Sequence, residues 1–379
     1  MLPSKIFKEI MMDINALRAE FPVTNHVTYL NNAAESPLNN RVRHRLADYL
    51  VFASELPHRK PSVRHAVKAM LCDLFGGAAD EYALVTSTGV GVSIVAAGYP
   101  WKPGDNMVVP ADEHWNNTFP WLALRQRGVD VRLVPVDANY RVNPQAVAER
   151  LDKNTRILAT AAVEFNTGFR ADLKQLSDMA HRAGALFMVD GIQAAGVCPL
   201  NIDADGIDIL ACAGFKWLLG MPGTGFLYVN HQAQEIIQPV MPGMFAADNT
   251  HTRDLLYFPD ARRYETGTIA YSLFHSWTAG LDLLKEVGIA NIHARVLQLT
   301  DHLIAGLRTR GIKIASPVDQ ISERSAILSL TVGSAQENQA CYEKLLAQDI
   351  IVAPRDGRIR VSPNFFNTEA EIDRFLQAL

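Results

Sequence analysis

The middle of the chain alternates between short apolar, β-branched segments and amphipathic helical segments. The helical segment 172–184 carries apolar residues on one face and ends at Gly184, a typical helix stop. Repetition of strand, helix and strand predicts an α/β domain with a mostly parallel sheet. Ligands bind at the carboxyl ends of the strands in such sheets, so we expect the chemistry just after the apolar segments. These segments span residues 106–110, 131–136, 156–163, 185–190, 208–214 and 225–229.

The pattern changes after about residue 280. A long helical stretch leads into short alternating strands with one further helix between them, which predicts a smaller α+β domain. The last segment has Asn367 or Thr368 as a candidate N-cap, followed by Glu371 in capping-box position. We therefore predict a large domain over residues 26–280 and a small domain over 281–379, with residues 1–25 packed on the small one.

Charge and cysteine usage exclude several classes of protein. The 379 residues carry a formal net charge of −4, which argues against a nucleic-acid binder and against a polybasic membrane-surface protein. The longest uncharged run, 83–101, holds Thr, Ser, Gly and Pro, so it is better interpreted as a strand, loop and helix than as a membrane span. No CxxC pair occurs, which favours a reduced, cytoplasmic setting without a metal site. The four cysteines are Cys72, Cys198, Cys212 and Cys341.

Three polar residues follow two of the predicted strands. Asp190 ends the segment FMVD, Gln193 comes three residues later, and Lys216 follows the segment ACAGF. A partly buried carboxylate needs a facing cation, and a lysine in an apolar setting becomes a nucleophilic amine. A protonated pyridine ring and an aldehyde satisfy both, so the set suits pyridoxal 5′-phosphate. Taken singly, these residues also have ordinary interpretations as a cap, a solvated glutamine and a surface lysine.

A phosphate group requires backbone amides at a helix start. The stretch TSTGVGVSIVAAG places Thr88, Gly89 and Val90 directly before an apolar helix, where they could cradle a phosphate. An ordinary strand–helix turn is the alternative. Position 94 is Ile, so the GxGxxG fingerprint is absent, and a nucleotide-binding protein is a weak third hypothesis.

Eight ordered stretches together resemble the class V aminotransferase superfamily of fold-type I enzymes, the group of cysteine desulfurases, isopenicillin N epimerase and kynureninase. The resemblance covers almost the whole chain and implies a three-layer PLP-transferase fold like that of aspartate aminotransferase. It also implies an enzyme whose substrate is a small molecule, an α-amino acid. The stretches are 29–38, 86–98, 112–121, 164–173, 187–202, 211–229, 262–268 and 359–373.

The resemblance implies a role for each matching residue. Lys216 would hold the cofactor as an imine and move protons, Asp190 would pair with the pyridine nitrogen, and Gln193 would bind the phenolate oxygen. His114 would stack on the ring, and Asn166 would lie near the phenolate oxygen, although Glu164 or Phe165 could take that position.

Two further roles concern the substrate and a second subunit. Arg360 would bind the substrate carboxylate with a bidentate fork, and Arg355 and Arg358 lie close enough in sequence to share that role. Thr268 would reach the phosphate of the neighbouring subunit, which implies a homodimer with shared active sites.

The chain departs from the family pattern at two places. Phe215 precedes the lysine where a His is usual, so the phosphate needs a donor from elsewhere. No cysteine lies on a loop before Arg360, and Cys341 falls in a predicted helix, which disfavours sulfur transfer of the desulfurase type.

We therefore expect a PLP-dependent enzyme that forms an external aldimine with an α-amino acid and deprotonates its Cα. Transamination, β-elimination and epimerisation all remain open. A non-catalytic module with the same fold is an alternative that the intact Asp190, Lys216 and Arg360 disfavour. The substrate pocket could be lined by Trp115, Asn117, Trp121 and Tyr271, although the aromatic residues among them could equally belong to the core.

Overall fold

The computed structural model describes residues 13–59, 62–138, 140–248 and 254–379. Its centre is a seven-stranded sheet in the order β2-β8-β7-β6-β5-β3-β4. All neighbours are parallel except those of β8, which runs antiparallel to both β2 and β7. The strands are β2 (Tyr82–Leu84), β3 (Asn106–Pro110), β4 (Asp130–Val134), β5 (Thr155–Ala161), β6 (Leu186–Asp190), β7 (Ile209–Ala213) and β8 (Gly225–Val229).

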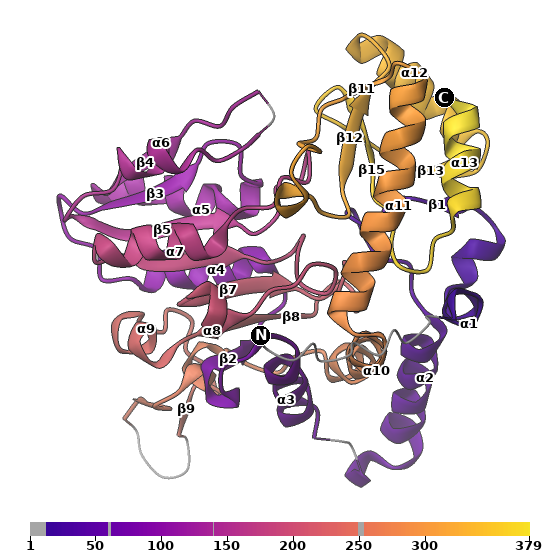
Figure 1. Ribbon diagram of the computed structural model, residues 1–379. Coiled ribbons are helices and arrows are strands. Elements are labelled where there is room, and N and C mark those ends of the chain that lie inside the picture. Colours follow the sequence, from indigo (N-terminus) through magenta and orange to yellow (C-terminus); the bar gives the residue numbers. More distant parts are fainter. Residues whose placement is uncertain (1–12, 60–61, 139, 249–253) are drawn as a thin grey trace, which may run out of the picture.

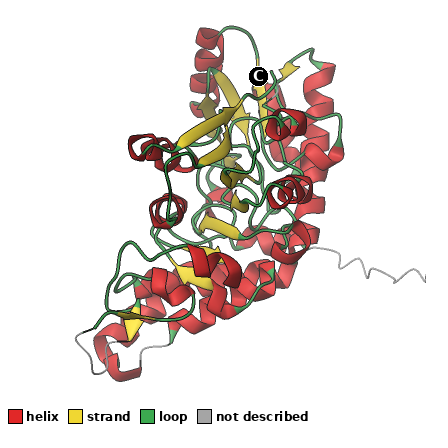
Figure 2. Ribbon diagram, turned by 90° about the vertical axis from the view of Figure 1, so that its left-hand side faces the viewer, coloured by secondary structure: helices red, strands yellow, loops and turns green. Residues whose placement is uncertain are grey.

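Helices cover both faces of this sheet, as Figures 1 and 2 show. Alternate strand residues enter different cores: Val108 and Leu158 belong to one, Met107 and Ile157 to the other. Burial on both faces explains why these strands are continuous apolar runs. The helices up to residue 287 are α1 (Ile14–Ala19), α2 (Asn40–Glu55), α3 (Val63–Phe75), α4 (Thr88–Gly98), α5 (Phe119–Leu122), α6 (Pro144–Ala148), α7 (Leu173–Arg182), α8 (Ile202–Asp205), α9 (His231–Ile236) and α10 (Tyr271–Val287).

A second, four-stranded antiparallel sheet follows the long helix α11 (Ile289–Thr309). Its strand order is β11-β12-β15-β14, and α12 and α13 pack with it around a separate apolar cluster. The remaining elements are β1 (Thr28–Tyr29), β9 (Ala247–Asp248), β10 (Leu256–Tyr257), β11 (Lys313–Ile314), β12 (Leu328–Thr331), α12 (Ala335–Leu346), β13 (Ile350–Ile351), β14 (Ala353–Arg355), β15 (Arg358–Val361) and α13 (Glu369–Ala378).

Residues 13–30 lie against the C-terminal part of the chain. Strand β1 pairs in parallel with β13, Arg18 forms a 2.6 Å ion pair with Glu371, and the ring of Phe21 stacks on Phe366. Residues 1–12 of the predicted N-terminal segment lie outside the described residues. The boundaries at residues 26 and 280 stay predictions.

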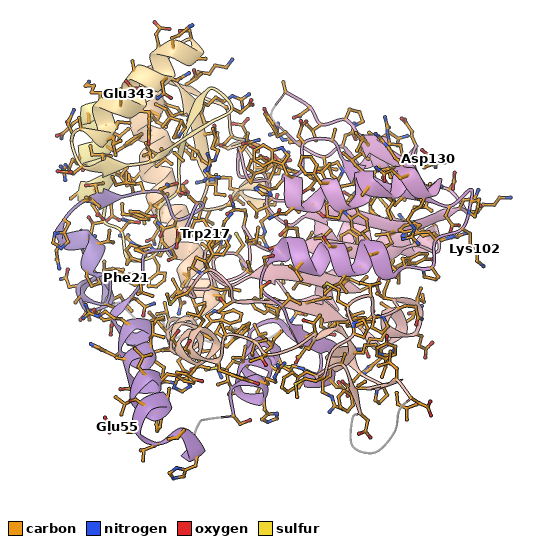
Figure 3. The ribbon with its side chains drawn as sticks, turned by 180° about the vertical axis from the view of Figure 1, so that it is seen from behind. Phe21, Glu55, Lys102, Asp130, Trp217 and Glu343 are labelled. Carbon is orange, nitrogen blue, oxygen red and sulfur yellow. The ribbon has the colours of Figure 1, made fainter. Side chains whose placement is uncertain are left out.

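The strand direction determines where a site can form. Figure 3 shows Lys102, just before β3, and Asp130, at the start of β4, at the outer edge of the molecule, with Trp217 toward the middle. The carboxyl ends of the parallel strands therefore point toward the small sheet. Among the described residues, no helix is long and apolar enough to cross a membrane.

Candidate active site

A cavity of about 320 Å³ lies at the carboxyl ends of β3, β5, β6 and β7, beside the first turn of α4 and opposite β14 and β15. It brings together six of the predicted site residues from five separate segments. The lining residues that carry polar or aromatic side chains are Ser87, Thr88, Glu113, His114, Trp115, Asn116, Phe165, Asp190, Gln193, Phe215, Lys216, Arg355 and Arg360.

Asp190 and Gln193 form one wall of the cavity. Asp190 is the last residue of β6 and is 2% exposed, and its Oδ1 accepts a 2.9 Å hydrogen bond from the N–H of Ile192. Burial raises the pKa of Asp190 to about 6, opposed by that hydrogen bond and by the charge of Lys216. The side chain of Gln193 donates to the carbonyl of Ala33 and accepts from the indole N–H of Trp217, which fixes its orientation.

Lys216 lies in a bend three residues after β7. Strand β7 pairs with β6, which ends at Asp190. The pKa of Lys216 falls to about 8, first because burial disfavours the charged amine and second because Arg360 is nearby, while Asp190 acts in the opposite direction. An amine with this pKa is partly unprotonated near neutral pH. It can act as a nucleophile or a base.

The N-terminus of α4 forms the opposite wall. The first N–H groups of a helix have no intrahelical partner, so this end attracts anions. Ser87 is the N-cap and its Oγ accepts from the N–H of Val90 at 3.2 Å, while the hydroxyl of Thr88 accepts from the N–H of Ala213. The cavity is lined by Ser87 and Thr88 but not by Gly89 or Val90. The phosphate contacts predicted for Thr88, Gly89 and Val90 stay predictions.

His114 lies in the loop after β3, with its ring edge-on to Phe165 at 5.1 Å between centroids. Burial lowers the pKa of His114 to about 4, helped by the charges of Lys216 and the two arginines, so the imidazole is neutral at pH 7. Its neighbour Glu113 accepts from the N–H of Ala161, and burial raises the pKa of Glu113 to about 8. Sequence reasoning did not single out Glu113.

Arg360 reaches the cavity from β15 of the small sheet. The side chain is 1% exposed, and its Nη1 donates to the carbonyl of Phe165 at 2.7 Å. Nε and Nη2 have no hydrogen-bond partner among the described residues. These two nitrogens form the side of the guanidinium that binds a carboxylate with two parallel hydrogen bonds. Burial, and then the charge of Arg355, lower the pKa of Arg360 to about 10.

Asn166 and Thr268, like Gly89 and Val90, do not line this cavity. Glu164 accepts hydrogen bonds from the N–H groups of Asn166 and Thr167, which turns the loop so that Phe165 lines the cavity and Asn166 does not. Thr268 is exposed and also lies outside the cavity lining of this chain. The cofactor contacts predicted for both residues stay predictions.

The two tryptophans considered as pocket residues lie in different environments. Trp115 lines the cavity and is 61% exposed, whereas Trp121 is fully buried in the core between the sheet and α4. None of the described cysteines lines the cavity. Cys341 lies in α12, and β14 and β15 are joined by the two-residue turn of Asp356 and Gly357, with no loop that could carry a cysteine.

A family model for aminotransferase class V matches residues 28–375, more than nine-tenths of the chain. The chain belongs to the aminotransferase class-V family. It is therefore a pyridoxal-phosphate-dependent enzyme, and the cofactor expected from the sequence is confirmed at the level of the family.

Known proteins similar to this class V chain include a probable cysteine desulfurase from Methanothermobacter thermautotrophicus, 27% identical over 96% of each chain. An uncharacterized aminotransferase from Bacillus subtilis is 27% identical over 94% of each chain. Among solved structures, a cysteine desulfurase from Thermococcus onnurineus NA1 has a TM-score of 0.89 at 21% identity, covering 96% of both chains. A cystine C–S lyase has a TM-score of 0.88 at 22% identity, covering 94% of this chain and 98% of the lyase. These likenesses confirm the predicted fold type I.

Proposed function

We propose that the cavity holds pyridoxal phosphate between Asp190 and Lys216 and acts on the Cα–H bond of an amino acid. A buried carboxylate at a strand end, a lysine of lowered pKa and a helix N-terminus match the three polar parts of the cofactor. Gln193 would use its remaining amide N–H toward the phenolate oxygen. The Ser87 hydroxyl would donate to the phosphate in place of the family's usual histidine, which is Phe215 here.

The observation that carries the proposal is the free fork of Arg360. Burying a guanidinium without an ion pair is unfavourable, so its retention indicates a ligand that completes it. A carboxylate bound at Nε and Nη2 would orient an amino acid with its Cα toward Lys216. Arg360 would hold the carboxylate and Lys216 would act as the base, and both line the same cavity. A substrate held at Arg360 can therefore be oriented toward Lys216.

Pyridoxal phosphate, when bound, withdraws electrons from Cα and so makes its proton acidic. Lys216 would remove that proton, because an amine with a pKa near 8 has a substantial unprotonated fraction at neutral pH. Asp190, kept ionised by a facing cation, would hold the ring nitrogen protonated. The imidazole of His114 is neutral, so its ring face would stack on the cofactor ring without adding charge there.

Three outcomes after deprotonation remain within the proposal. Return of the proton to Cα gives epimerisation, its delivery to another atom gives transamination, and loss of a β-substituent gives β-elimination. The relatives named as cysteine desulfurases favour cleavage of a C–S bond as a second candidate. Since none of the described cysteines lines the cavity, such a reaction would release its sulfur without a persulfide on this chain.

A homodimer is part of the same proposal. Thr268 is exposed and is the residue expected to complete a partner's phosphate site. Analytical ultracentrifugation would give the mass in solution, and a monomer that still turns over substrate would contradict the shared site.

The direct test incubates the coenzyme-loaded protein with a panel of amino acids, with and without pyruvate. Keto acid, ammonia, sulfide and optical inversion are assayed together, and Lys216→Ala serves as the inactive control. At least one of these products should form with the parent enzyme. A protein that binds the coenzyme yet leaves every amino acid unchanged would overturn the proposal.

A further inference from the structure

The hairpin of β14 and β15 places three arginines on one face of the small sheet. Ala353 pairs with Arg360, and Arg355 pairs with Arg358, across a two-residue turn. Opposite residues of an antiparallel pair point to the same side, and so do residues two apart on a strand. Arg355 and Arg360 are therefore diagonal neighbours, which lie roughly 7–8 Å apart in such sheets, and both line the cavity.

The three guanidinium groups differ in what already holds them. Arg358 donates to the hydroxyl of Tyr140 and lies 3.6 Å from a carboxylate oxygen of Asp356. Arg360 is anchored on a backbone carbonyl. Arg355 donates one hydrogen bond of 3.2 Å to the carbonyl of its own neighbour Pro354, and it pairs with no carboxylate among the described residues.

Among the described residues that line the cavity, no acidic side chain pairs with Arg355. Three cations line the cavity: Lys216, Arg355 and Arg360. Of the two acids there, Asp190 is committed to the cofactor nitrogen under the proposed function. Glu113 is bound to backbone and side-chain donors and has a raised pKa. The proposed function provides the cofactor aldehyde for Lys216, the N-terminus of α4 and Ser87 for the cofactor phosphate, and the α-carboxylate for Arg360. It assigns no partner to Arg355.

We propose that Arg355 binds an acidic group on the substrate side chain, so that the enzyme selects amino acids that carry a second negative charge. This inference rests on the proposed function, because it assigns the α-carboxylate to Arg360. Arg355 is exposed and lines the cavity, so its guanidinium suits a group that enters with the substrate.

The experiment compares isosteric pairs on the coenzyme-loaded enzyme: aspartate with asparagine, and glutamate with glutamine. Both kcat/KM and the amino-acid concentration that half-saturates the change in coenzyme absorbance are measured. The parent should favour one acid over its amide by about 10- to 100-fold, as one charge-assisted contact allows. Arg355→Gln should remove that preference while retaining reaction with the amide, which also shows that the variant is folded. Arg358→Gln, on the same face but already paired, should keep the preference.

A binding measurement without turnover complements this test. Titration calorimetry of the loaded enzyme should show succinate or glutarate binding about 10-fold or more tighter than butyrate, and Arg355→Gln should abolish the difference. The inference would be overturned if Arg355→Gln lowered kcat/KM equally for acids and amides, or if the parent favoured the amides. Either result would leave the proposed function intact. Absence of any response to all amino acids would instead overturn the proposed function.

Discussion

Replacing Arg360 by leucine should make the chain more stable and much less active. The folded chain buries this guanidinium with Nε and Nη2 unused among the described residues, so its charge is held at a cost that the charge of Glu164 and the hydrogen bond to Phe165 offset only in part. Leucine removes that cost together with the only group in β15 that can bind a carboxylate within the cavity. Stability and activity should therefore change in opposite directions.

The magnitudes follow from the pKa and the contacts. The pKa of Arg360 falls to about 10 on folding, which corresponds to about 3 kcal/mol against the charged form at neutral pH. The sign is that of a base with a lowered folded-state pKa: the cost is full below pH 10 and fades as the pH rises further. Loss of the hydrogen bond to Phe165 offsets about 1 kcal/mol, leaving a gain of about 2 kcal/mol. Two lost charge-assisted hydrogen bonds, at about 1.5–3 kcal/mol each, lower kcat/KM by roughly 10²–10⁴.

The assay pairs urea unfolding of the coenzyme-free protein at pH 7, followed by circular dichroism, with kcat/KM for a responsive amino acid. Arg358→Leu is the matched control, since Arg358 already has Tyr140 and Asp356 as partners and its loss should not stabilise the chain. An Arg360→Leu protein that unfolds at lower urea than the parent, or that keeps kcat/KM within a few-fold, would refute the reasoning.

Three further predictions concern the walls of the cavity. Incorporation of pyridoxal phosphate into the coenzyme-free protein, followed by absorbance, should reach half its maximal rate near pH 8, and a midpoint near 10 would contradict the burial of Lys216. Between pH 4.5 and 8 the folded chain retains a proton on Glu113 that the unfolded chain releases, so this group makes stability fall as the pH rises; Glu113→Gln should flatten that slope in urea unfolding at pH 6 and 8. Trp217→Phe removes the donor to Gln193 and should lower kcat/KM about 3- to 10-fold with the coenzyme still bound, whereas an unchanged rate would separate this hydrogen bond from catalysis.

The alternating apolar segments predicted the fold well because each strand is buried on both faces. Sequence also predicted the helix that begins after the Thr368 cap, where the Glu371 carboxylate returns to the cap N–H. Asp190 and Lys216 could be associated in advance because chemistry in parallel sheets gathers at carboxyl strand ends, and β6 and β7 turn out to be neighbours.

Other parts of the site depend on contacts that spacing does not reveal. Arg360 comes from a separate sheet, and only the family resemblance connected it with the strand ends. The loop after β5 placed Phe165 at the cavity because the Glu164 carboxylate binds two backbone N–H groups, which local sequence does not specify. Ser87 had a detectable signal as an N-cap three residues before Val90, and Glu113 had none beyond its position beside His114.

Locating the coenzyme on the chain tests the central claim most directly. The loaded enzyme is reduced with borohydride, digested, and mapped by mass spectrometry. The account predicts a pyridoxyl group on the peptide that contains Lys216 and none on the Lys216→Ala protein. A pyridoxyl group on a different lysine, or none after full loading, would contradict it.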